Sequence, residues 1–219
     1  MKKPFTRNDL RSGAVSVLIK GRWGNADLYI YEQNHNAWVV KDFSYCPPAV
    51  YKTWGRFLVM REYHALNRLQ GIRGIPRSPF LMDRYTLCYK YMPGQTLGET
   101  EPQMLDEGFF YKLEHLVKRI HARHTVHLDI RNRRNILVID NKKPALLDFQ
   151  SSLNLKRVPP LFHKLLKDID ISGVYKMWQL KKPESMDIDR QRRLEDLNKM
   201  RFLWVLKGYP LGTRKDRRR

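Results

Sequence analysis

The sequence predicts an α+β fold with two lobes, in which an antiparallel sheet with one helix precedes a mainly helical half. Segments rich in β-branched and aromatic residues, separated by tight turns, fill most of residues 14–43. Apolar residues then recur with a period of about 3.6 at 57–69 and again at 109–120, which is typical of amphipathic helices. The order of strands and then helices is the basis of this prediction.

The boundary between the lobes is expected at Met92-Pro93-Gly94-Gln95, which interrupts both patterns and has the composition of a hinge. We therefore expect a first lobe at residues 1–92, a second lobe at 93–212 and a basic tail at 213–219. The chain contains no internal repeat and no low-complexity tract.

The first lobe is expected to hold five strands and one helix. A meander of three strands is predicted at 14–20, 28–31 and 38–43, with turns at 21–25 and 34–36. Pro47-Pro48 ends this pattern. A helix follows at 57–69 and stops at Gly71, and two further strands are predicted at 80–82 and 86–91.

The second lobe is expected to be mostly helical. One apolar helix face is predicted over 109–120, followed by a loop and a hairpin with strands at 136–139 and 145–147. Two closing helices are predicted at 161–180 and 190–206, the second ended by Gly208-Tyr209-Pro210.

The composition is that of a folded, intracellular protein. The chain has 219 residues, 42% of them hydrophobic, which is enough for one large or two small domains and excludes a disordered chain. No apolar run approaches the roughly 18 residues needed to span a bilayer, and the basic start has no apolar stretch of a secretory signal. Cys46 and Cys88 are expected as reduced, buried thiols. We expect a cytoplasmic location, including the inner face of the membrane.

Net charge points to an anionic partner. Lys+Arg number 42 and Asp+Glu 22, giving a net charge of +20. Such a field attracts RNA, DNA, anionic lipid headgroups and phosphorylated glycans, and is compatible with peripheral membrane contact. A purely nucleic-acid-binding protein would explain the charge, but it would not explain the acidic motifs described next.

The most informative stretch runs from His127 to Leu137 and is followed by Leu146-Leu147-Asp148-Phe149-Gln150. Asp129 can accept a hydroxyl proton as a catalytic base. Asn135 and Asp148 supply the hard oxygen donors that Mg²⁺ prefers, on adjacent loops of one hairpin. An acid, an amide and a second acid in this order are the set that phosphoryl transfer from ATP needs.

Lys41 and Glu62 are the upstream candidates. Lys41 follows two valines on a strand, where it can place a point charge on the α- and β-phosphates of ATP. Glu62 lies on the following helix and is its natural carboxylate partner. Ordinary surface roles, a snorkelling lysine and a solvated glutamate, are the alternatives.

Two further segments are candidates for binding the nucleotide. Gly21 and Gly24 could form a tight turn whose amides meet phosphate, although an ordinary β-turn fits these residues equally well. Tyr91 and Met92 would line an adenine pocket through their backbone groups if they lie in the hinge.

Arg131, Arg133 and Arg134 crowd the candidate base. Arg131 stands two residues after Asp129, where a cation could touch the transferred γ-phosphate. The other two could bind an anionic acceptor, or could simply belong to a basic surface.

These residues together resemble the protein-kinase-like fold over about Val15 to Trp178. His127-x-Asp129 looks like the catalytic loop, Asp148-Phe149-Gln150 like the metal-binding Asp-Phe-Gly, and Lys41 and Glu62 like the strand-3 lysine and its helix-C partner. The resemblance implies a Mg²⁺-ATP site, a hydroxyl acceptor and a fold with a sheet-rich first lobe and a truncated, mainly helical second lobe.

The chain departs from the protein-kinase motifs at several positions, and these departures indicate which kinase group it resembles more. Asn135 stands six residues after Asp129, one more than in H-R-D-L-x-x-x-N, so Asn132 is a rival ligand. Gln150 replaces the glycine, and only a short, basic, proline-containing link at 155–162 stands where a long activation segment would follow. The chain therefore looks more like the small atypical kinases: the RIO type, the bacterial Kdo- and heptose-lipopolysaccharide kinases, and a related archaeal class that phosphorylates transfer RNA.

The leading hypothesis is an ATP- and Mg²⁺-dependent phosphotransferase. The expected acceptor is a sugar hydroxyl of a glycolipid of the lipopolysaccharide-core type, or of RNA. The alternatives are a protein Ser/Thr kinase of RIO type and a non-catalytic pseudokinase that scaffolds a polyanion.

Overall fold

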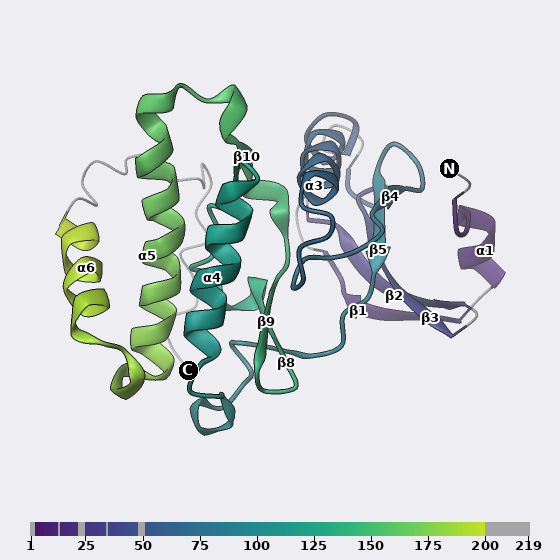
Figure 1. Ribbon diagram of the computed structural model, residues 1–219. Coiled ribbons are helices and arrows are strands. Elements are labelled where there is room, and N and C mark those ends of the chain that lie inside the picture. The colour runs from purple at the N-terminus through teal and green to yellow at the C-terminus, as the bar shows by residue number, and fades with distance from the viewer. Residues whose placement is uncertain (1–2, 13, 22–24, 34, 48–50, 200–219) are drawn as a thin grey trace.

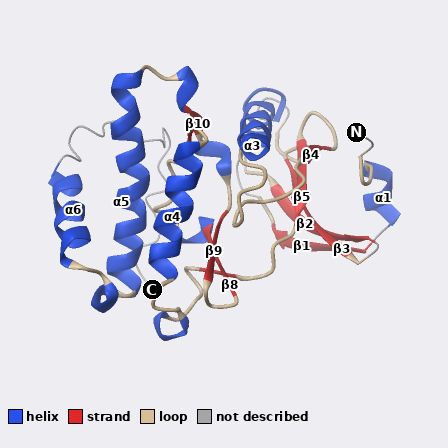
Figure 2. Cartoon of the chain, viewed as in Figure 1, coloured by secondary structure: helices blue, strands red, loops and turns tan. Residues whose placement is uncertain are grey.

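The computed structural model describes residues 3–12, 14–21, 25–33, 35–47 and 51–199. Within them the chain forms the two lobes that the sequence predicts. Figure 1 shows a sheet and one long helix on one side, and three roughly parallel helices on the other. In Figure 2 most of the strands gather in the first lobe and most of the helices in the second. Gly24 and the basic tail at 213–219 lie outside the described residues.

The first lobe is built on a five-stranded antiparallel sheet in the order β1-β2-β3-β5-β4. Its strands are β1 (Ala14–Ile19), β2 (Asp27–Gln33), β3 (Asn36–Asp42), β4 (Phe80–Leu81) and β5 (Thr86–Lys90). The predicted meander and the two later strands are thus confirmed. The central strand β3 places Lys41 opposite Leu28 of β2 and Leu87 of β5.

A short helix that the sequence analysis missed covers the outer face of this sheet. Helix α1 (Arg7–Ser12) follows Phe5, which is 2% exposed and packs against Tyr31 with ring centroids 4.6 Å apart. Arg7 donates to Asp42 of β3 at 2.8 Å and to Asp83 at 2.6 Å. The N-terminal segment is therefore fixed to the sheet by both apolar packing and charge.

The predicted helix of the first lobe is α3 (Arg56–Arg68), preceded by a π-helical turn η1 (Tyr51–Gly55). Its buried face consists of Val59, Glu62, Ala65 and Leu66, at the helical spacing of three and four residues. Three members are apolar and pack into the core. The fourth, Glu62, is a carboxylate that needs a partner at this depth.

Within the described residues, the second lobe contains two small sheets and three α-helices. Strands β6 (Gln95–Thr96), β8 (Ile136–Ile139) and β9 (Lys143–Leu146) form one sheet, and β7 (Thr125–Val126) pairs with β10 (Leu153–Asn154). The helices are α4 (Phe109–Ala122), α5 (His163–Lys181) and α6 (Ile188–Lys199). Short helical turns lie at η2 (Pro102–Met104), η3 (Arg133–Asn135), η4 (Phe149–Ser151), η5 (Leu155–Arg157), η6 (Pro160–Phe162) and η7 (Pro183–Ser185).

Two boundaries differ from the sequence prediction, and the end of the last helix cannot be compared with it. Gln95 was placed in the hinge but begins β6, which pairs with β8. Gly94 allows this pairing, because a Cβ there would lie 2.6 Å from the Val138 carbonyl oxygen and its φ is +157°. Leu161 was placed in the first closing helix but lies in η6. The last helix is described only to Lys199, so the rest of its predicted range lies outside the described residues.

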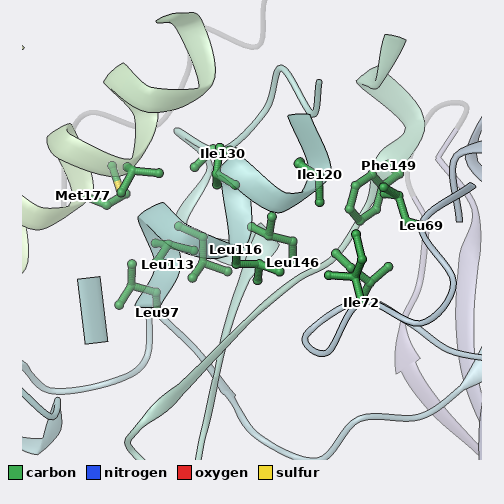
Figure 3. Close-up of a cluster of buried hydrophobic side chains, with 14 of the residues drawn as sticks. Leu69, Ile72, Leu97, Leu113, Leu116, Ile120, Ile130, Leu146, Phe149 and Met177 are labelled. Atoms are coloured by element: carbon green, nitrogen blue, oxygen red, sulfur yellow. The ribbon is translucent and has the colours of Figure 1, made fainter. Parts of the chain in front are cut away.

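One continuous apolar core joins the two lobes. Figure 3 shows Leu69 and Ile72, which follow α3, next to Phe149, while Leu113 and Leu116 of α4 extend the cluster. Each of these side chains is at most 5% exposed. Burying a side chain of this size contributes roughly 1.5–3 kcal/mol to the stability of the fold. Apolar packing next to α3 therefore already couples the position of this helix to the second lobe.

Neither Cys46 nor Cys88 forms a disulfide, as expected. Cys88 is buried as predicted, whereas Cys46 is only half-buried. None of the helices in the described residues combines the length and the apolar composition required to cross a membrane.

Candidate active site

Lys41 lies at the centre of the candidate site. Its Nζ is 2.8 Å from Oε2 of Glu62 and 2.9 Å from Oδ1 of Asp148. Both Lys41 and Glu62 are buried, at 7% and 1% exposed. Strand β3, helix α3 and the segment after β9 therefore meet at a single ammonium group, and the predicted Lys41–Glu62 pair is present.

The ion pairs fix the charge state of this group. Burial alone would lower the pKa of Lys41, but the charges of Asp148 and Glu62 outweigh burial and raise it. For Asp148 the directions are reversed. Burial alone would raise its pKa, but the charge and the hydrogen bond of Lys41 leave the pKa below its ordinary value. Lys41 is therefore a cation and Asp148 an anion near neutral pH.

Asp148 has an unusual backbone conformation, and the segment that follows it is held by helix α3. Its φ of +61° and ψ of 72° are left-handed, a conformation that costs energy for a residue with a side chain. The next amide, Phe149 N–H, donates to Oε1 of Glu62 at 3.3 Å. Arg61 of α3 donates to the carbonyl oxygens of Ser152 at 2.7 Å and Ser151 at 2.9 Å. Two adjacent residues of α3 thus position the Asp148 loop.

Asp129 and Asn135 form the second half of the site. Nδ2 of Asn135 donates to Oδ2 of Asp129 at 2.7 Å and to its carbonyl oxygen at 3.2 Å. Burial raises the pKa of Asp129, and the charge of Asp148 adds to that effect. The raised pKa makes Asp129 a stronger proton acceptor than an ordinary aspartate, as a general base requires.

The rival ligand Asn132 has a different contact. Its side-chain oxygen accepts the N–H of Arg134 at 3.2 Å and caps η3. The side chain of Asn132 also hydrogen-bonds Asp129, but Asn132 is only half-buried. Asn135 is buried and donates to Oδ2 of the candidate base at 2.7 Å. The geometry therefore favours Asn135 as the amide of the site.

Asp170 is a site residue that the sequence analysis missed. This buried carboxylate of α5 accepts the backbone N–H groups of His127 at 2.8 Å and Leu128 at 2.7 Å, and it is 2.9 Å from Nε2 of His121. Leu128 has a left-handed φ of +66°. The two hydrogen bonds offset the strain of that backbone and orient Asp129, the next residue.

One signal for Asp170 was present in the sequence. The residue stands four positions after Leu166 and four before Val174, both of them buried on α5. An acid within an apolar helix stripe indicates a buried polar partner.

The three arginines next to Asp129 have different environments. Arg131 is half-buried and donates from Nη2 to Oγ of Ser172 on α5 at 2.9 Å. Arg133 and Arg134 are exposed. Only the latter two are therefore placed like residues of an acceptor surface, and a contact of Arg131 with the γ-phosphate stays a prediction.

The candidate nucleotide-binding residues of the first lobe are placed as follows. The N–H of Gly21 donates to Oδ1 of Asp27 at 2.7 Å, so that amide already has an anionic partner. Tyr91 and Met92 directly follow β5, and the N–H of Tyr91 donates to the carbonyl oxygen of Ala37 at 2.9 Å. Both residues thus lie between β5 and β6, and their contact with adenine stays a prediction.

A cavity of about 500 Å³ touches Tyr91, but its lining includes none of Lys41, Glu62, Asp129, Asn135 and Asp148. We therefore do not assign the nucleotide to this cavity.

The donor set fits a magnesium ion. Asp148 is a carboxylate with a side chain that is 39% exposed, and Asn135 contributes an amide oxygen because its Nδ2 is engaged by Asp129. Mg²⁺ is commonly held by one or two such oxygens together with substrate phosphates and water. Among the described residues there is no cluster of three or more His, Cys, Asp or Glu side chains that could hold a metal by itself.

Comparison with known proteins places the fold. No protein-family model and no curated protein sequence matches the chain. The crystal structure of the Rio2 kinase from Chaetomium thermophilum is similar over 90% of this chain and 76% of that chain, with a TM-score of 0.59 and 13% sequence identity. The complex of that kinase with ADP, Mg²⁺ and phosphoaspartate is similar over 90% and 74%, with the same TM-score and identity.

Similarity at this level of identity shows the fold. The match covers both lobes, since it includes 90% of the chain. The chain therefore has a small, atypical protein-kinase-like fold, as the residue pattern predicts.

Proposed function

We propose that this chain is an ATP- and Mg²⁺-dependent phosphotransferase that acts on a sugar hydroxyl of a phosphate-bearing acceptor. The observation that carries the proposal is the junction at Lys41, which contacts Glu62 and Asp148 at the same time. A scaffold protein has no need for a fully paired buried lysine that faces an exposed carboxylate across two lobes.

Each residue has a role that follows from its contacts. Lys41, held by Glu62, supplies a fixed positive charge to the α- and β-phosphates of ATP. Asp148 and Asn135 hold Mg²⁺, which when bound neutralises charge on the phosphates. Asp129, with its raised pKa, accepts the proton of the attacking hydroxyl. Positioning and electrostatics thus provide most of the rate enhancement.

The proposed acceptor class rests on charge and on the shape of the second lobe. The chain carries a net charge of +20, and Arg133 and Arg134 are exposed next to the catalytic loop. Only 14 residues separate Asp148 from the first residue of α5, His163, and a peptide substrate would lack a long docking segment. A sugar hydroxyl flanked by phosphate groups suits this surface, and a glycolipid and RNA both offer one.

The test uses γ-labelled ATP, Mg²⁺ and a whole-cell extract with the full-length chain. We expect label in the lipid or the RNA fraction, and we expect Asp129→Asn to abolish transfer while keeping ATP affinity within about threefold. Asp140→Asn is the matched control, because Asp140 is an exposed acid at the other end of the β8–β9 hairpin and should leave transfer unchanged.

The fraction that is labelled identifies the acceptor. An RNA acceptor predicts that transfer falls steeply with salt, because each neutralised phosphate releases counterions. Label in the protein fraction would favour the RIO-type alternative. Label on the chain itself that hydroxylamine releases would indicate a phosphoaspartate, the group present in the Rio2 complex. Transfer by Asp129→Asn at the normal rate would overturn the assignment, and ATP binding without any transfer would favour a scaffold.

A further inference from the structure

Three arginines from three different elements converge on the strand β7. Arg68 ends α3, Arg123 directly follows α4, and Arg157 ends η5. Nε of Arg68 donates to Oγ1 of Thr125 at 3.3 Å, and Nη1 of Arg123 donates to the carbonyl oxygen of Arg68 at 3.4 Å. In Figure 1 this region lies where β10 passes the end of α4. We call these three residues the arginine cluster.

Arg157 is brought to the same place by backbone pairing. Thr125 pairs with Asn154 in the β7–β10 ladder, and the N–H of Leu155 donates to the carbonyl oxygen of His124 at 2.7 Å. Arg157 follows two residues later in the same helical turn. In agreement with this placement, burial and the charge of Arg157 lower the pKa of Arg68.

Of the three members only Arg68 is half-buried, and Arg123 and Arg157 are exposed. The charge of the cluster is not balanced by carboxylates, in contrast to the charges of Arg7 and Arg190. Arg7 and Arg190 each contact two carboxylates, and these contacts raise the pKa of both. Among the described residues no Asp or Glu lies within ion-pair distance of any member of the arginine cluster. Like charges held together in this way repel one another, and an anion is needed to offset that repulsion.

We propose that the arginine cluster is a binding site for a phosphate group, separate from the candidate active site. Guanidinium groups suit this ligand because their paired N–H donors match phosphate oxygens. Three such groups from three elements can surround one dianion. The ligand chemistry is that of a single phosphate group, from free phosphate or from a polynucleotide backbone.

The location gives the site a consequence for both lobes. Arg68 belongs to α3, which also carries Arg61 and Glu62, whereas Arg123 and Arg157 belong to the second lobe. A bound phosphate would therefore connect α3 to the second lobe by charge, beside the apolar core that already joins them. The binding proposal itself does not depend on catalysis by this chain.

The experiment compares two double variants of the full-length chain. Arg123→Gln/Arg157→Gln removes two charges from the cluster and leaves the packed Arg68 in place. Arg84→Gln/Arg192→Gln is the control, because it removes the same charge from exposed positions elsewhere. The affinity for inorganic phosphate is measured by calorimetry, with chloride at matched ionic strength as the reference. We expect at least a tenfold loss of affinity in the cluster variant and less than a twofold change in the control.

Thermal unfolding gives a second readout, because the variant should change the unfolding temperature differently without and with phosphate. Without phosphate, the cluster variant should unfold at the same or a higher temperature than the wild type, because repulsion is relieved. With phosphate, it should lose most of the stabilisation that the wild type gains. A residue with only a packing role would lower the midpoint in both conditions.

Two outcomes would overturn the proposal. One is equal phosphate affinity in the cluster variant and the wild type, which would mean only diffuse binding to a basic surface. The other is an equal loss in both double variants. A short single-stranded oligonucleotide then distinguishes the sources: much tighter, cluster-dependent binding of the oligonucleotide than of inorganic phosphate points to a polynucleotide backbone, and equal affinity points to the free ion.

Discussion

Lys41 and Asp148 stand 107 residues apart in the sequence, yet their side chains form an ion pair of 2.9 Å between the two lobes. Lys41 is buried, whereas the Asp148 side chain is 39% exposed. The pair therefore presents one face of a carboxylate to solvent while a cation holds the other face. A carboxylate oriented in this way suits a metal that arrives with its nucleotide.

Replacing Asp148 by Asn should remove the effect of Mg²⁺ on ATP binding. The amide keeps the shape of the side chain but loses the negative charge that a hard cation requires. We expect the Mg²⁺-dependent gain in ATP affinity to fall at least tenfold, while metal-free ATP binds as tightly as before or more tightly. Calorimetry with and without Mg²⁺ measures both. An unchanged Mg²⁺ effect would remove Asp148 from the metal site.

Replacing Lys41 by Met should destabilise the fold strongly. Glu62 is 1% exposed, and it would be left as a buried carboxylate without its cation. Breaking a buried pair from one side costs about 3–5 kcal/mol. Urea denaturation checks this value, with Lys143→Met as the control. That lysine pairs with Asp140 at the surface, both side chains about 70% exposed, so its loss should cost at most about 1 kcal/mol.

The same variant should respond to pH in a defined direction. Without Lys41, burial raises the pKa of Glu62 further, and its protonated form becomes the one that the fold tolerates. The penalty should therefore be small in acid and grow as pH rises through the raised pKa. A penalty that is independent of pH would contradict this account of Glu62.

Replacing Asp170 by Asn should separate phosphate transfer from nucleotide binding. The amide retains one acceptor oxygen and turns a donor toward one of the N–H groups of His127 and Leu128. We expect the free energy of unfolding to fall by about 2–4 kcal/mol. The rate of phosphate transfer should fall at least tenfold, and the affinity for ATP should stay within about threefold of the wild-type value. Asp168→Asn, which loses only a 3.3 Å contact to the half-exposed Arg193, is the control. Normal transfer by Asp170→Asn would mean that the loop is held by other contacts.

Replacing Arg7 by Gln should weaken the first lobe at neutral pH but not in acid. Burial raises the pKa of Asp42, but its hydrogen bond from Arg7 and two from Ser44 leave it lowered overall. A carboxyl with a lowered pKa in the folded state stabilises the fold above its unfolded pKa, and that contribution is lost as pH falls through the folded pKa.

The variant should therefore be less stable by about 1–3 kcal/mol at pH 7 and equal to the wild type below the folded pKa of Asp42. Urea denaturation at a series of pH values measures the difference. Arg11→Gln, an exposed position on the same helix, should show neither effect. A constant difference across the pH series would mean that Arg7 acts by packing.

The order of strands and helices could be predicted because their apolar patterns are long. Residues 57–69 and 109–120 show a helical period over several turns, and the meander has turn residues at both bends. The two-residue strands β7 and β10 could not be predicted, because no period can be read from two residues. Helix α1 has six residues and takes its position from Phe5 and Arg7, which contact residues far along the chain.

The candidate site could be predicted where chemistry is local. Asp129 and Asn135 lie within one loop, and the pairing of Lys41 with Glu62 follows from a strand and the next helix. The link from Lys41 to Asp148 depends on how the lobes meet, which no short motif encodes. Asp170 was missed for the same reason, because its role becomes visible only when α5 lies beside the catalytic loop.

The outermost strand of the sheet has a consequence for the behaviour of the protein at high concentration. Within the described residues β1 pairs with β2 alone, and Val17 and Ile19 are more than half exposed on it. An apolar strand with an open edge is a template for pairing between copies. At low salt concentration, repulsion between copies that each carry a net charge of +20 opposes such contacts. Since the Debye length shortens to about 3 Å at 1 M salt, concentrated salt should turn this edge into a site of self-association.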